Sequence, residues 1–307
     1  MKLTQKALST THRVIVYGPP GTGKTELVGR LSEYKNLLWF DLDNGYTTLL
    51  KFPDEWKERI DIISLPDTKS FPIGIETCLK VIKGGLCRIC EEHGKVSCPT
   101  CTRDAKPVAT VELNKLDTDT VVVFDSLTQL TASALAHITR GKDEEYKMQT
   151  DDWGSLAKLL EVFLSHVQQA SYNIVCISHE VDTEKDEKAP ERLVPVAGSR
   201  NTSKNSGRYF DEVIRAELKN LKHRFYSSTT AGMTFAASSR TGFRIEDLTT
   251  PSLVPLFCPD KRPANMPVQV DNTGVEAQTV QSTTKLQGIL ARVQAAKVAL
   301  TPTPAPT

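Results

Sequence analysis

The segment Val14-Ile-Val-Tyr-Gly-Pro-Pro-Gly-Thr-Gly-Lys-Thr25 decides the fold of this chain. Its residues Gly18–Thr25 match the pattern G-x-x-x-x-G-K-[ST], after a short apolar run and before a helical pattern that begins near Lys24. Glycines let bare backbone amides approach a phosphate chain, and a helix N-terminus favours anions. We therefore predict a phosphate-binding loop between a strand and a helix.

The residue types of this loop suit ATP and Mg²⁺. Lys24 can neutralise the β and γ phosphates, and the Thr25 hydroxyl can bind the metal ion. A glycine-rich turn without a ligand is the alternative, which the flanking strand and helix disfavour. The expected nucleotide contacts from the loop are Gly18, Pro19, Pro20, Gly21, Thr22, Gly23, Lys24 and Thr25.

A second acidic residue is needed to hold the water shell of the magnesium ion. Asp125 supplies it, because it ends the apolar run Val121–Asp125, although such an Asp can also merely cap a turn. Ser126 follows it where many AAA+ ATPases have a catalytic Glu. The carboxylate that activates water must therefore come from elsewhere, and Asp41 and Asp43 are the candidates, with a solvated turn as the alternative.

Short β-rich runs alternate with helical patterns from Arg13 to about Phe257, which indicates an α/β fold with a mainly parallel sheet. Ligands of such sheets gather at the carboxyl ends of the strands. We expect an ATPase core over residues 1–258. The expected strands are Val14–Tyr17, Leu37–Asp41, Ile60–Ser64, Val121–Asp125, Asn173–Ser178, Asp211–Leu218, Arg224–Ser227 and Met233–Ala236, and the clearest helices are Ile75–Ile82 and Trp153–Ala170.

Composition excludes two classes of protein. No apolar run in the 307 residues approaches the roughly 18 residues needed to cross a bilayer, which argues against an integral membrane protein. The net charge of +1, from 38 basic and 37 acidic residues, argues against binding nucleic acid by bulk charge and leaves a local basic surface open. No signal-peptide core is present near the N-terminus, so we expect a cytoplasmic protein.

Four of the seven cysteines form two C-x-x-C pairs within an expected insertion over residues 84–108. Cys87, Cys90, Cys98 and Cys101 would place four thiolates around one Zn²⁺, with His93 as a less favoured substitute. A redox pair and an iron–sulfur cluster are the alternatives. Four thiolates leave no open position for a substrate, so the zinc would be structural. The insertion could touch nucleic acid or dock a protein, and its sequence favours neither.

The C-terminal residues 259–307 contain no aromatic residue and are rich in Thr, Gln, Ala and Pro. This composition is typical of a flexible tail. Residues 285–300 are the exception, because their apolar positions allow a short amphipathic helix that could dock on a partner.

Several motifs in order resemble the RecA-type recombinase core, and most closely the small phage RecA-like ATPases associated with single-strand annealing and recombination. The resemblance covers residues 13–245. It rests on Gly18–Thr25, Phe40-Asp-Leu-Asp43, Leu65-Pro-Asp-Thr68, Val123-Phe-Asp-Ser-Leu-Thr128 and Cys176-Ile-Ser-His179.

The resemblance implies roles for three further residues. Asp43 would position the attacking water, where RecA has Glu, and His179 would sense the γ-phosphate, where RecA has Gln. Arg240 would extend into the ATP site of a neighbouring subunit, which implies a homo-oligomer, either a ring or a filament. For His179 and Arg240 the alternative is an ordinary packed or surface side chain.

The stretch Glu180–Gly207 is expected to be a long loop, and the resemblance implies that it binds DNA. An acid-free part around Ser199–Arg208 offers three cations for phosphate contacts, Arg200, Lys204 and Arg208. A solvated surface loop is the alternative.

The leading functional hypothesis is an ATPase that cycles its grip on single-stranded DNA during annealing or strand exchange. A second is a P-loop loader or regulator that docks a replication or single-strand-binding protein through the zinc insertion or the tail. A third is a small-molecule or nucleotide kinase. If the chain is phage-encoded, the expected location is the cytoplasm of the bacterial host.

Overall fold

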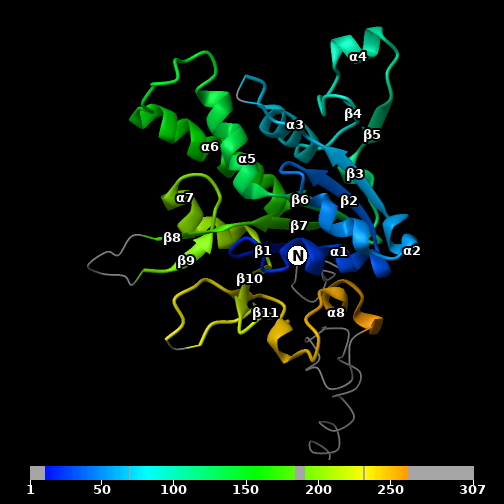
Figure 1. Cartoon of the computed structure of the whole chain (residues 1–307), viewed down its shortest axis with the longest axis vertical. Coiled ribbons are helices and arrows are strands. Elements are labelled where there is room, and N and C mark those ends of the chain that lie inside the picture. Colours follow the sequence, from blue (N-terminus) through cyan, green and yellow to red (C-terminus); the bar gives the residue numbers. More distant parts are fainter. Residues whose placement is uncertain (1–10, 69, 184–190, 231, 262–307) are drawn as a thin grey trace, which may run out of the picture. The chain divides into compact units, whose positions relative to one another are not determined.

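The computed structural model describes residues 11–68, 70–183, 191–230 and 232–261 (Figure 1). Within these residues eight strands form a central sheet in the order β11-β10-β1-β7-β6-β2-β3, with β12 beside β10. The strands of this sheet are β1 (Arg13–Tyr17), β2 (Asn36–Asp41), β3 (Ile60–Ser64), β6 (Thr120–Asp125), β7 (Asn173–Ser178), β10 (Glu212–Lys219), β11 (Lys222–Tyr226) and β12 (Ser238–Ser239).

The six strands from β10 to β3 are parallel, and only β11 and β12 run antiparallel to β10. The central strands are buried on both faces, which explains why they read as continuous apolar runs without alternation. This arrangement confirms the mainly parallel α/β fold expected of a RecA-like core.

Helices cover both faces of the sheet. The helical segments are α1 (Lys24–Gly29), η2 (Arg30–Glu33), η3 (Gly45–Lys51), α2 (Asp54–Lys57), α3 (Ile73–Ile82), α4 (Pro99–Arg103), η4 (Leu113–Lys115), α5 (Leu127–Ile138), α6 (Thr150–Gln169), α7 (Arg200–Asn205), η5 (Ser206–Tyr209), η6 (Ile245–Asp247), α8 (Val254–Phe257) and η7 (Pro259–Lys261). Helices α3, α5 and α6 pack on one face, whereas α1, η2 and α8 pack on the other.

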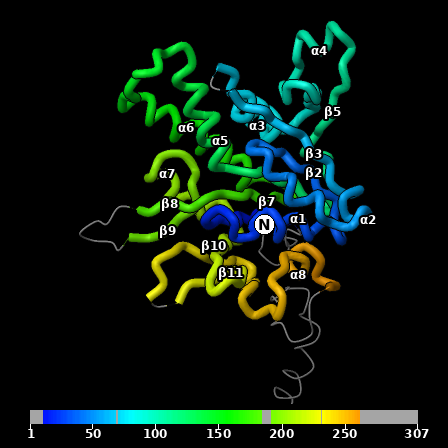
Figure 2. The backbone as a smooth tube through the Cα atoms, in the orientation of Figure 1, coloured from blue at the N-terminus to red at the C-terminus, as the bar shows by residue number. Residues whose placement is uncertain are grey.

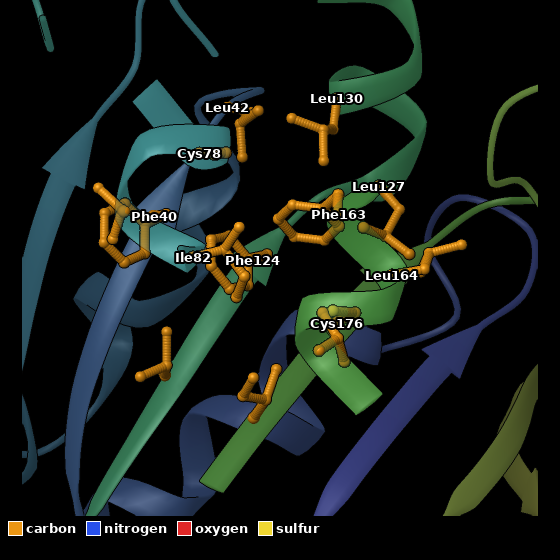
Figure 3. Close-up of a cluster of buried hydrophobic side chains, with 14 of the residues drawn as sticks. Phe40, Leu42, Cys78, Ile82, Phe124, Leu127, Leu130, Phe163, Leu164 and Cys176 are labelled. Carbon is orange, nitrogen blue, oxygen red and sulfur yellow. The ribbon is translucent and has the colours of Figure 1, made fainter. Parts of the chain in front are cut away.

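The larger core lies between the sheet and the helices α3, α5 and α6 (Figure 3). Phe40 of β2 stacks on Phe124 of β6 at 5.1 Å, and Phe124 meets the edge of Phe163 of α6 at 5.1 Å. Cys78 and Cys176, two of the cysteines outside the C-x-x-C pairs, are fully buried here. Helix α6, expected over Trp153–Ala170, contributes Leu156, Leu160, Phe163, Leu164 and Val167 to this core.

Strands β1, β7, β6 and β2 are adjacent and parallel, so their carboxyl ends meet at one edge of the sheet. Asp41 is the register partner of Asp125, and Tyr17 is the partner of Ser178. The residues that follow these strands therefore converge, although they come from distant parts of the sequence.

The cysteine-rich insertion forms a separate small unit. Its strands β4 (Cys87–Cys90) and β5 (Val108–Val111) pair antiparallel, and α4 lies between them in the sequence. Figure 2 shows this unit beside β3 and α3, and α3 contacts β4 directly.

Two sequence-based expectations about secondary structure are wrong. Met233–Ala236 is not a strand, because only Phe235 forms a bridge, to Leu193. The stretch Glu180–Gly207 is not one loop: it contains the hairpin of β8 (Glu180–Asp182) and β9 (Leu193–Pro195) and then α7. Polar Ser and Thr side chains conceal α7 in the sequence, but two of them, Thr202 and Ser203, are buried against the body.

The expectations for the tail fall largely outside the described residues. Residues 259–261 form η7, and the predicted flexible segment beyond them, with the possible helix 285–300, lies outside the described residues. No helix within the described part of the chain is long and apolar enough to cross a membrane.

Candidate nucleotide-binding site

The predicted phosphate loop follows β1 directly and wraps around the start of α1. Gly18 is necessary because a Cβ atom there would lie 2.1 Å from the backbone oxygen of Ala216 in β10. Gly23 precedes α1 with a left-handed φ of 83°, a conformation that favours glycine. The loop thus lies between β10 and the start of α1, with its amides at the helix N-terminus.

Lys24 lies buried within this loop. Its ammonium group donates to the carbonyl oxygens of Gly18 at 2.9 Å and Pro19 at 2.7 Å. Burial lowers the pKa of Lys24 to about 8, while the carboxylate of Asp125 opposes this shift. A phosphate chain would replace the neutral carbonyls with anionic oxygens and favour the charged lysine.

Three carboxylates gather next to Lys24. Asp125 lies at the end of β6, where its Oδ2 is 3.3 Å from the Thr25 hydroxyl. Asp43 accepts a hydrogen bond of 3.1 Å from Ser126, and Asp41 accepts one of 3.0 Å from the Gly45 amide. Sequence reasoning named all three residues, and the structure brings them together.

The cluster is electrostatically unfavourable by itself. Burial, then repulsion from Asp43 and Asp41, raises the pKa of Asp125 to about 8. Burial raises the pKa of Asp41 to about 6, and its Oδ2 has no hydrogen-bond partner among the described residues. A group of carboxylate oxygens that repel one another suits a hard divalent cation such as Mg²⁺.

His179 follows β7 and lines the same pocket. Its backbone amide donates to the Thr128 hydroxyl at 2.8 Å, which orients the residue. Burial, then the charge of Lys24, lowers the pKa of His179, and its Nδ1 has no partner within the part of the chain that the structure describes. His179 therefore lines the pocket with a buried Nδ1 that bonds to no described residue.

The pocket has a volume of about 550 Å³, which falls within the range of small-molecule sites. The predicted loop residues from Pro20 to Thr25 line it together with Asp43, Asp125 and His179, whereas Gly18, Pro19 and Asp41 do not. The further lining residues are Glu26, Gly45, Thr47, Thr48, Lys51, Ser126, Ile177, Ser178 and His223. Ser126 was noted in the sequence only because it is not Glu. Thr47, Thr48 and Lys51 could have been predicted as pocket residues, because they follow the candidate Asp43 closely in the sequence.

His223 is a pocket residue that sequence reasoning missed. Strand β10 continues for four residues, Ala216–Lys219, beyond its last pairing with β1, so the β10–β11 hairpin extends along the phosphate loop. The His223 ring on this hairpin lies 3.2 Å from the position that a Cβ of Gly23 would occupy. Only the tertiary fold brings these two residues together, about 200 positions apart in sequence.

A family model described as an AAA domain matches residues 10–241. The chain belongs to this family. The matched span contains the phosphate loop, the three carboxylates, His179 and His223.

Other comparisons add less. No curated protein matches the chain. Among solved structures, the crystal structure of the RadB recombinase is similar at 16% identity and a TM-score of 0.34, over 67% of this chain and 74% of that one. A KaiC-like protein from Pyrococcus horikoshii is similar at 12% identity and a TM-score of 0.34, over 73% and 79% respectively.

Arg240 lies far from the pocket of its own AAA domain. Its backbone amide donates to Asp211 and its guanidinium donates to the carbonyl of Arg208 at 2.7 Å. These contacts lie where β1 and β10 begin, whereas the phosphate loop follows the other end of β1. Arg240 therefore cannot serve the ATP site of the same chain.

The three cations predicted to bind DNA lie on one short exposed segment of the AAA domain. Arg200 and Lys204 are four residues apart on α7, so they share one side of it. Arg208 follows in η5 and donates to the Tyr209 hydroxyl at 2.6 Å.

The metal-ligand group of the insertion differs from the predicted one. Ligand atoms of Cys90, His93, Cys98 and Cys101 all lie within 4.8 Å of one another. The thiol of Cys87 does not join them. Cys87 and Cys90 both lie on the extended strand β4, where residues three apart point to opposite faces, and Cys87 is buried in the main core.

Proposed function

We propose that this AAA domain is an ATPase that couples ATP hydrolysis to the binding of single-stranded DNA, as in the phage RecA-like annealing and recombination proteins. The observation that carries the proposal is the convergence of Lys24, Asp125 and Asp43 on one pocket of about 550 Å³. These three residues support the proposed ATP hydrolysis. The cations of α7, and the hydrogen bonds between the pocket and the segment before α7, support the proposed role in DNA binding.

The phosphate loop would bind the triphosphate, and Thr25 and Asp125 would hold Mg²⁺. When bound, this ion bridges phosphate oxygens and neutralises the charge that develops in phosphoryl transfer. Lys24 would stay protonated against the β and γ phosphates, because their negative charge opposes the effect of its burial.

Asp43 is our candidate for positioning the attacking water. It is exposed at the pocket, whereas Asp41 is buried and its Oδ1 is occupied by the Gly45 amide. The hydrogen bond from Ser126 holds the Asp43 carboxylate in place beside Asp125. A carboxylate that is both solvent-accessible and held can accept a proton from water.

A short path of hydrogen bonds supports coupling between the pocket and α7. The carbonyl of His179 accepts from the Val196 amide at 3.0 Å, and Ser178 donates to the Val196 carbonyl at 2.8 Å. Val196 precedes α7 by only a few residues. A shift of His179 toward a γ-phosphate would therefore reach Arg200 and Lys204, the proposed DNA contacts, through this segment.

The position of Arg240 supports an intersubunit site. It lies at the amino ends of the strands, on the opposite edge from its own pocket, so it could act only on the nucleotide of a neighbouring copy. Mixing two inactive variants, Lys24→Ala and Arg240→Ala, tests this: a composite site restores hydrolysis at mixed interfaces, and independent sites restore nothing.

The proposal is tested by measuring ATP hydrolysis with and without single-stranded DNA. DNA-stimulated hydrolysis supports it. Hydrolysis without any DNA effect, together with no salt-sensitive binding to labelled single strands, would instead favour a loader that docks a replication or single-strand-binding protein through the insertion or the tail. Under either function we expect the protein to act in the cytoplasm.

A further inference from the structure

The insertion carries a cluster of four soft ligands. His93 Nδ1 lies 3.1 Å from the Cys101 sulfur and 3.9 Å from the sulfurs of Cys90 and Cys98. All three sulfurs are buried, whereas the imidazole is exposed and closes the cluster on its outer side.

These separations fit a tetrahedral zinc ion. With Zn–S bonds of about 2.3 Å and Zn–N bonds of about 2.0 Å, a nitrogen and a sulfur on the same ion lie about 3.6 Å apart. The observed values lie on both sides of this distance. Small side-chain rotations would therefore complete the geometry without moving the backbone.

Two tight turns present the ligands. In the first, the Gly94 amide donates to the Cys90 carbonyl at 2.8 Å and the Cys90 amide donates to Lys95 at 3.1 Å. In the second, the Thr102 amide donates to the carbonyl of Cys98, the N-cap of α4, at 3.0 Å. The first turn brings Cys90 and His93 together, and the second brings Cys98 and Cys101 together.

We propose that Cys90, His93, Cys98 and Cys101 bind one structural zinc ion, and that Cys87 is a core residue and not a ligand. The pattern in sequence is C-x-x-H followed by C-x-x-C. Binding releases the protons of three thiols to solvent, while neutral His93 gives its Nδ1 lone pair. Four protein ligands leave no position for a substrate.

The zinc site holds the turn around Gly94 against β3 and α3 of the AAA domain. Gly94 packs on the backbone of Ser64 and Leu65 so closely that a Cβ there would lie 2.7 Å from the Ser64 oxygen. Its carbonyl accepts a buried hydrogen bond of 2.7 Å from Thr77 of α3. The Leu65 amide in turn donates to Asp41 at 2.8 Å. The site thus supports the strand edge next to the carboxylate cluster.

The experiment measures zinc content after dialysis, in the full-length protein and in single variants purified with reductant. We expect one zinc per chain in wild type and in Cys87→Ala, and loss of zinc in Cys98→Ser and Cys101→Ser. His93→Ala should weaken zinc binding by more than about tenfold, since removal of an outer-shell partner alone costs that much. His93→Cys should restore it.

Cobalt substitution of wild type gives a second readout that needs no variant. A site with three sulfurs and one nitrogen absorbs differently in the visible range from one with four sulfurs. The proposal is overturned if Cys87→Ala loses zinc while His93→Ala keeps it, or if cobalt reports four thiolates. It is also overturned if wild type binds neither metal, or carries iron with cluster absorption.

Discussion

Asp41 and Asp125 are register partners at the ends of β2 and β6, and burial raises the pKa of both carboxyl groups. A sheet that needed only to be stable would not place two acids side by side with one oxygen lacking a partner among the described residues. This pair therefore supports the proposal that this edge of the sheet binds a cation.

The pH dependence of stability should report this pair. The pKa of Asp125 is about 8 in the fold against an ordinary 3.8, so the native state binds the proton more tightly than the unfolded chain. Its contribution is complete at low pH and is lost as pH rises toward 8. In Mg²⁺-free buffer without chelator, the Tm of wild type should therefore fall more between pH 6 and 8.5 than that of Asp125→Asn.

The control for this comparison is Asp119→Asn, an exposed carboxylate paired with Lys35. It should keep the wild-type profile. Added Mg²⁺ should raise the Tm of wild type most at high pH, where Asp125 has lost its proton to solvent and its carboxylate can bind the metal, and should barely affect Asp125→Asn. Parallel Tm profiles for wild type and Asp125→Asn would contradict the assignment.

The close approach of β10 to the phosphate loop predicts a contrast between two glycines. A Cβ at Gly18 would meet the Ala216 oxygen at 2.1 Å, so Gly18→Ala should cost about 1–3 kcal/mol of folding stability. At Gly154 in α6 nothing lies within 4 Å, so Gly154→Ala should stabilise the protein by about 0.5–1 kcal/mol. Urea denaturation measures both, and equal effects would show that β10 does not restrict the loop.

His223 should contribute to nucleotide binding. Loss of a hydrogen bond of ordinary strength from His223→Ala should weaken ATP binding by about fivefold in a fluorescent-nucleotide titration, with little change in Tm because the side chain is exposed. Lys222→Ala is the matched control, since neighbouring strand residues point to opposite faces. Equal affinity for the two variants would remove His223 from the site.

The cations of α7 should account for the salt dependence of DNA binding. Replacing a lysine that contacts a phosphate should lower the slope of log K against log salt by about 0.7 for single strands. We expect this of Lys204→Ala. Lys115→Ala, an exposed lysine of η4 that pairs with Glu112, should leave the slope unchanged. An unchanged slope in Lys204→Ala would mean that α7 does not contact DNA.

Local patterns were sufficient to predict the phosphate loop and the core strands. A phosphate-binding loop such as Gly18–Thr25 needs glycines and a lysine at fixed spacing, so that its amides can approach the phosphates. The strand Val121–Asp125 is buried on both faces, so its first four residues are all apolar. Asp43 could be named because it lies just beyond the strand that ends at Asp41, whereas His179 was named only through the resemblance to the RecA-type core.

The remaining features depend on contacts that spacing does not encode. Two C-x-x-C pairs predicted four thiolates, but the first pair lies on an extended strand, which turns Cys87 into the core and brings His93 into the cluster. His223 lies next to Gly23 only because the β10–β11 hairpin, about 200 positions later in the sequence, packs along the phosphate loop. Helix α7 was missed because its buried residues are Ser and Thr.

The most direct test of the account is the rate of ATP hydrolysis by Lys24→Ala, measured with Mg²⁺ and single-stranded DNA beside wild type and the control Lys57→Ala, a lysine of α2 that pairs with Asp54. Removal of a charge that stabilises the transition state typically costs about 10²–10³-fold, so Lys24→Ala should lose nearly all activity while Lys57→Ala keeps it. Hydrolysis by Lys24→Ala at the wild-type rate would contradict the claim that this pocket is the ATPase site.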